Sequence, residues 1–122
     1  GKRINMAYDT FLADRVAQFF NEKSIHFEAR KMFGGLCYMI DDKMCVGVMG
    51  NEIMARIDPE MYQESLLKEG CKEMNFTGRP MKGFVFLTDA AIDLDIDLNY
   101  WLQLALDFNP KAKASPKKKK KL

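Results

Sequence analysis

Apolar residues recur along the start of the chain with the spacing of an α-helix. Between Tyr8 and Asn21 they recur at offsets of three, four or eight positions, which places them on one stripe: Tyr8, Phe11, Leu12, Val16, Phe19 and Phe20. Asp9 stands where a helix cap is expected, and its charge suits the positive end of the helix dipole. We favour packing of this stripe on a sheet over the alternative, an aromatic ligand pocket.

Four strand patterns follow this helix in quick succession. They cover 27–33, Leu36–Ile40, Met44–Met49 and Ile53–Ile57. The polar turn Asp41-Asp42-Lys43 joins the second pattern to the third, which is typical of a β-hairpin. Because strands joined by short turns pair with each other, the sequence predicts an antiparallel meander.

The central hairpin is apolar at nearly every position instead of at alternate ones. Strands with this pattern are covered on both faces. The helices of a small domain cover one face, so the second face needs another covering. Two interpretations stay open: self-association or a protein partner covers it, or loops and long side chains do.

The second half of the chain alternates between helix and strand signals. Asp58-Pro59-Glu60 is a helix start, with Asp at the cap and Pro at the first position. Phe84–Leu87 has the pattern of a short buried strand, and the acids between Asp89 and Asp97 introduce a last helix that ends before Pro110. Residues 71–76 fit no single pattern. The sequence predicts an α+β fold with two layers, one antiparallel sheet of about five strands packed against three helices.

Length and charge divide the chain into a globule and a tail. The 122 residues suffice for one domain, which we place at residues 1–110, followed by a flexible lysine-rich tail at 111–122. The tail carries seven lysines and no acid, whereas residues 1–110 carry 12 cations and 17 anions, a net charge of −5. No apolar run reaches the roughly 20 residues of a membrane helix, and no signal peptide is visible, so we expect a cytoplasmic protein without membrane contact.

The residues that usually carry chemistry are few. Cys37, Cys45 and Cys71 form no C-x-x-C pair, which disfavours a disulfide framework or a zinc site. His26 is the single histidine, and the acids between Asp89 and Asp97 lack the glycine and glutamate of a calcium loop. We therefore expect no catalytic residues, no metal and no cofactor, and favour a non-enzymatic function.

Two glycine-anchored segments, Lys31–Gly35 and Thr77–Gly83, each combine cations with backbone freedom. The first is either an anion or peptide-end site or a junction between strands, and we favour the junction. The second is a loop that either presents Arg79 to a phosphate or carboxylate or simply connects two elements. The candidate binding surface comprises Arg30, Lys31, Gly34, Gly35, Arg79, Lys82 and Gly83.

The tail adds a separate electrostatic candidate. Its lysine run consists of Lys117, Lys118, Lys119, Lys120 and Lys121. Adjacent lysines attract nucleic acid through counterion release, but no aromatic residue lies among them to stack bases. We expect a solubilising segment or weak nucleic-acid binding.

Several segments together resemble one known family. They are K-M-F-G-G at Lys31–Gly35, M-C-x-G-V at Met44–Val48, M-x-R-I at Met54–Ile57 and F-T-G-R-P-M-K-G at Phe76–Gly83. Over about residues 6–108 the chain resembles the TfoX N-terminal domain family, and within it the short stand-alone members. Longer relatives, the TfoX/Sxy competence regulators, carry a second helical domain and activate transcription together with a cyclic-AMP receptor protein. The resemblance implies an antiparallel sheet against helices and supplies no catalytic residues.

Three functional hypotheses follow. The first is a non-catalytic regulatory or protein-interaction domain, with self-association as a homodimer or a protein partner. The second is weak nucleic-acid binding through the lysine tail and the basic loops. The third is binding of a small anion or metabolite at the glycine segments.

Overall fold

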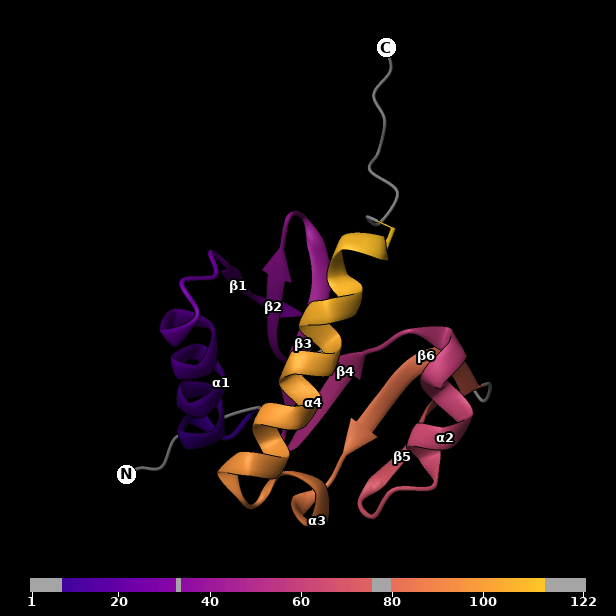
Figure 1. The fold of residues 1–122 in the computed structure, drawn as a ribbon. Helices are drawn as coiled ribbons and strands as arrows, with labels where there is room; N and C mark the ends of the chain where they lie inside the picture. Colours follow the sequence, from indigo (N-terminus) through magenta and orange to yellow (C-terminus); the bar gives the residue numbers. More distant parts are fainter. Residues whose placement is uncertain (1–7, 33, 76–79, 114–122) are drawn as a thin grey trace.

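The computed structural model describes residues 8–32, 34–75 and 80–113 (Figure 1). The elements follow in the order α1 (Thr10–Glu22), β1 (Glu28–Met32), β2 (Gly35–Ile40), β3 (Lys43–Met49), β4 (Glu52–Arg56), η1 (Pro59–Met61), α2 (Tyr62–Leu66), β5 (Cys71–Asn75), β6 (Pro80–Leu87), α3 (Asp89–Ile92), α4 (Asp95–Phe108) and η2 (Asn109–Lys111). The α+β class is confirmed.

A single sheet holds the six described strands in the order β1-β2-β3-β4-β6-β5, with every neighbouring pair antiparallel. The predicted meander of the first four strands is confirmed. The sixth strand comes from residues 71–75, where the sequence pattern was ambiguous. The described part of the chain also has four α-helices where three were expected, because α3 forms a separate single turn before α4.

The helices lie together on one face of this sheet. In Figure 1, α4 passes in front of β3 and β4, with α1 beside it and α2 near β5 and β6. The main apolar core lies between the two layers and combines residues of the helices with every second residue of the strands. The Tyr38 hydroxyl of β2 donates a 2.8 Å hydrogen bond to the carbonyl of Ala13 and so fixes α1 on the sheet.

The sequence prediction for α1 is largely confirmed. Asp9 caps the helix by accepting hydrogen bonds from the backbone N–H groups of Phe11 and Leu12, at 2.9 and 3.2 Å. Val16 and Phe20 are fully buried against the sheet. The prediction is wrong for Phe11, which is 72% exposed. Phe11 lies at the edge of the stripe, where α1 meets α4 instead of the sheet.

The opposite face of the sheet carries a second apolar cluster that contains strand residues only. Its members are Met32, Cys37, Met39, Met44, Met49, Met54, Met74, Phe84 and Phe86. We refer to these nine residues as the methionine face. Four of them are buried although no described helix covers them, and the other five are half-buried. Long side chains of the strands therefore cover part of this face, as expected if loops and long side chains provide its covering.

A β-bulge places two consecutive apolar residues of the central hairpin on the same face of the sheet. Tyr38 pairs with Val46 and Met39 with Met44, which leaves Cys45 as an extra residue in β3. Both Cys45 and Val46 belong to the main core. The bulge thus turns two consecutive residues toward the helices, while Met44 stays on the methionine face.

Candidate functional site

The structure places the two predicted glycine segments near opposite edges of the sheet. Arg30 and Lys31 lie in the edge strand β1, whereas Lys82 and Gly83 lie in β6, beside the other edge. Three strands separate them, a distance of about 19 Å along the sheet at the usual strand spacing. Arg79 lies outside the described residues. The described members of the predicted surface are thus divided between two distant parts of the sheet.

The first glycine segment is a tightly packed strand junction. Gly34 has a φ of 76° in the turn between β1 and β2, where glycine is favoured. Gly35 is buried, and a Cβ atom there would meet the carbonyl oxygen of Val48 and lie 2.7 Å from the sulfur of Met49. Packing and backbone geometry therefore explain both glycines without a ligand.

The second glycine segment is part of a strand from Pro80 onward. The expected strand start at Phe84 is therefore wrong, because β6 begins at Pro80, a residue that a strand tolerates at its first position. Lys82 is exposed, and Gly83 has a φ of 92°. The carbonyl of Gly83 accepts a 2.7 Å hydrogen bond from the backbone N–H of Ile57, which ties β6 to the segment after β4. Binding at this segment stays a prediction.

The cysteine thiols lie inside the protein. Burial raises the pKa of Cys45 to about 12 and that of Cys71 to about 11, and it also raises the pKa of Cys37. These thiols therefore stay protonated near neutral pH and are poor nucleophiles. His26 is exposed between α1 and β1. Among the described residues, no group of three or more His, Cys, Asp or Glu side chains is arranged to hold a metal ion.

The methionine face is built around a glycine. Gly47 lies in β3, and a Cβ atom there would be 3.1 Å from the terminal methyl of Met54 and 3.2 Å from that of Met49. The missing side chain lets these methionines lie flat across the strand. Methionine is flexible and polarisable, so such a surface repacks easily against different apolar shapes.

Ion pairs flank the methionine face on both sides. Arg30 lies 3.0 Å from Glu28 in the edge strand β1, and Lys72 of β5 lies 3.3 Å from Glu52 of β4. The hydrogen bond and charge of Arg30 lower the pKa of Glu28. These four residues share the face because each pairs across strands with one of its apolar members.

Arg56 lies on the same face at the end of β4. Its guanidinium lies 5.3 Å from the centre of the Phe84 ring, a cation–π distance, and donates a 3.2 Å hydrogen bond to the carbonyl of Lys113. Burial lowers the pKa of Arg56, although it stays charged near neutral pH. The methionine face thus has an apolar centre and a rim with charges of both signs, as protein interfaces have.

Charge is divided unequally between the two layers of the protein. The helical layer, residues 9–23, 58–70 and 88–111, contains 12 acids and 4 cations, a net charge of −8. The strand layer, residues 28–57, 71–75 and 80–87, contains 5 acids and 6 cations, a net charge of +1. The acidic character of the globule therefore resides in its helices.

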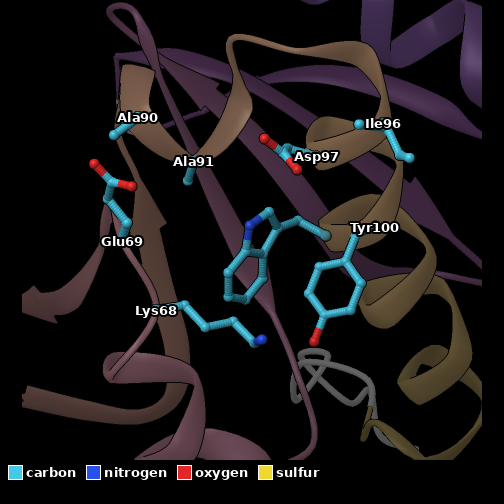
Figure 2. A pocket seen from close by; sticks show the side chains of 8 residues that line it. Lys68, Glu69, Ala90, Ala91, Ile96, Asp97 and Tyr100 are labelled. Atoms are coloured by element: carbon cyan, nitrogen blue, oxygen red, sulfur yellow. The ribbon is translucent and has the colours of Figure 1, made fainter.

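Hollows line both sides of α4 on the outer surface of the helical layer. One lies between α1 and α4 beside Phe11, and another lies between α4 and the end of α2 beside Tyr100. A third hollow, between α1 and α4, shares Phe19 with the first and Ile96 with the second, so the three adjoin one another. We refer to these adjoining hollows as the α4 groove. Figure 2 shows Lys68 and Tyr100 extending toward each other across the second hollow.

Sequence reasoning missed this groove. The available signals were two apolar residues in the first half of the last helix, Ile96 and Tyr100, which fall outside its buried stripe. Neither side chain was singled out, because isolated exposed apolar residues are ordinary.

Comparison with known proteins identifies one family. Residues 22–109 match the TfoX N-terminal domain family. No curated protein and no solved structure gives a significant match. Among the described residues, no helix has both the length and the apolar character needed to cross a membrane.

Proposed function

This chain belongs to the TfoX N-terminal domain family, and we propose that it is a non-catalytic protein-interaction domain that self-associates through the methionine face. The observation that carries the proposal is the second apolar cluster, which only strand residues form and which no described helix covers. Covering its half-buried methionine and phenylalanine side chains removes apolar surface from water, at about 25 cal/mol per Å². A regulatory role through such assembly fits the family.

Charge favours a second copy of the chain as the occupant of this face. Two helical layers, each with a net charge of −8, repel each other, so copies meet more readily through their strand layers. A two-fold axis parallel to the strands places β1 of one copy opposite β5 of the other. Each flanking ion pair then meets an ion pair of the other copy, which adds no unbalanced charge.

The free, buried state of the cysteine thiols is consistent with a non-catalytic domain in a reducing compartment. All three cysteines are free and buried, and their raised pKa values disfavour the thiolate. Free cysteines of this kind are typical of the cytoplasm. We propose that location for the assembled protein.

Sedimentation equilibrium of matched variants tests the proposal. Met44→Glu adds a negative charge to the methionine face, and Ile96→Glu adds the same charge to the exposed helical surface. We expect the wild-type chain and Ile96→Glu to shift from monomer to dimer with increasing concentration, and Met44→Glu to stay monomeric. Circular dichroism confirms that each variant is folded.

Two results would overturn the proposal. One is a wild-type chain that stays monomeric at all concentrations. The other is a folded Met44→Glu variant that assembles as the wild type does, because a buried unpaired carboxylate is strongly disfavoured in an apolar interface.

Nucleic-acid binding through the lysine tail stays an alternative prediction. Arg79 and Lys117 to Lys121 lie outside the described residues. The helical layer, with its net charge of −8, opposes the approach of phosphates from that side. The alternative predicts binding that falls steeply with salt and is lost when residues 111–122 are deleted.

A further inference from the structure

The α4 groove exposes large apolar side chains on the side of the protein opposite the methionine face. Ile96 is 75% exposed, Phe11 is 72% exposed and Tyr100 is 41% exposed. Ile96 and Tyr100 are four positions apart on α4 and so lie on one side of that helix. Large exposed apolar residues that line adjoining hollows mark an interaction site more often than scattered single residues do.

The walls of the groove are acidic. Asp14, Glu22 and Asp95 line the hollow beside α1, and Glu69 and Asp97 line the hollow beside α2. Figure 2 shows Glu69 and Asp97 around the second of these hollows. These carboxylates belong to the helical layer, whose net charge of −8 creates a negative potential over the whole surface.

The cations of the groove are already engaged within the protein. Arg15 lies 2.9 Å from the carboxylate of Asp95 and donates a 3.0 Å hydrogen bond to the carbonyl of Ile92. The ammonium groups of Lys23 and Lys68 each lie 5.2 Å from the centre of an aromatic ring, Phe19 and Tyr100 respectively. The lining contains five acids and these three cations, a net charge of −2, so its negative charge is only partly compensated.

We infer that the α4 groove binds a basic amphipathic helix of a partner protein. Apolar side chains of that helix contact Phe11, Ile96 and Tyr100, while its lysines and arginines pair with the surrounding carboxylates. This combination is the helix-in-groove mode of recognition, with charge complementarity added. A second copy of this chain does not fit, because its own helical layer has the same negative charge.

The inference concerns a different face from the proposed self-association. The methionine face contains strand residues only, whereas the groove is formed by α1, α3, α4 and the turn after α2. A dimer formed through its sheets therefore keeps both grooves accessible, and either proposal can fail without the other.

The single tryptophan of the chain offers a direct reporter of binding. Trp101 lines the hollow beside α2, is 3% exposed, and lies with its ring centre 5.1 Å from that of Tyr100. A helix seated on Tyr100 changes the surroundings of the indole ring, and its fluorescence shifts accordingly.

The experiment uses designed peptides of about 14 residues, or roughly four helical turns. The probe is an amphipathic Leu/Lys peptide. A Leu/Glu peptide of the same pattern tests the charge requirement, and a Ser/Lys peptide of the same charge tests the apolar requirement. Titration into the full chain is followed by Trp101 fluorescence and by calorimetry. We expect saturable binding of one Leu/Lys peptide per chain that weakens with salt, and much weaker binding of both controls.

Two variants locate the binding site. Ile96→Ser should weaken Leu/Lys binding by about tenfold or more, the effect of losing about 1.4 kcal/mol of apolar contact. Leu67→Ser removes an apolar side chain that is 87% exposed and does not line the groove, so it should leave binding unchanged. The inference is overturned if the Leu/Lys peptide does not bind, if the Ser/Lys peptide binds equally well, or if the two variants behave alike.

Discussion

Two adjacent glycines at the junction of β1 and β2 serve different physical purposes. Gly34 has a left-handed φ of 76° and open space around its missing side chain, whereas Gly35 lies against Val48 and Met49. The first position needs backbone freedom, and the second needs close approach of neighbouring strands. The pair therefore has a structural role that does not depend on any ligand.

Replacing each glycine with alanine distinguishes backbone freedom from close packing. Gly35→Ala should destabilise the protein by about 3 kcal/mol, because a methyl group meets backbone atoms that cannot move cheaply. Gly34→Ala should cost only about 1 kcal/mol of left-handed strain. Urea unfolding of both variants measures the difference, and equal losses would show that Gly35 is not closely packed.

The buried thiols predict a loss of stability at alkaline pH. The folded-state pKa of Cys45 is about 12 and that of Cys71 is about 11, both above the ordinary value of 9.0. Above about pH 9 the unfolded chain therefore releases thiol protons that the folded chain retains. Their contribution to stability is complete below that pH and is lost as the pH rises toward 11 and 12.

Urea unfolding between pH 7 and pH 10.5 measures this effect. For each thiol proton that the folded chain retains and the unfolded chain has released, the free energy of unfolding falls by up to about 1.4 kcal/mol per pH unit. Cys45→Ala should make the alkaline decline less steep, since it removes the thiol with the highest of these pKa values. A variant that declines as steeply as the wild type would contradict the assignment to Cys45.

At the scale of elements, turn chemistry and periodicity predicted most of the fold. The cap at Asp9, the stripe of α1 and the hairpin turn between β2 and β3 all appear in the structure. Strand β5 was not recognised because its pairing shifts register between Glu73 and Asn75, which breaks the alternation that a strand pattern requires. Its buried residues, Cys71 and Met74, are therefore three positions apart instead of two.

The candidate surfaces were predicted less completely than the fold. The apolar hairpin correctly indicated that the second face of the sheet is apolar as well. The strand pattern could not predict what covers that face. The α4 groove depends on residues from separate elements, such as Phe11 and Ile96, which only the packing of α1 beside α4 brings to one surface. The periodicity of α1 assigned Phe11 to the core, and it could not show where α1 packs beside α4.

At the scale of the whole molecule, the two faces differ in both chemistry and charge. The sheet presents methionines within a nearly neutral strand layer, and the helices present a groove within a layer of net charge −8. A charge asymmetry of this kind orients partners before contact, because like charges repel and opposite charges attract over about 8 Å at physiological salt. The two proposals together describe an assembly that joins through its sheets and displays acidic grooves outward.

Methyl NMR of methionine tests self-association through the sheet most directly. Six of the nine methionines lie on the methionine face, whereas Met61 lies in the helical layer and serves as an internal control. With ¹³C-labelled methionine methyls, we predict that dilution shifts the signals of half-buried members of the face, such as Met44 and Met49, and leaves Met61 unchanged. Face signals that stay constant on dilution, or a Met61 signal that moves as much as theirs, would contradict the account.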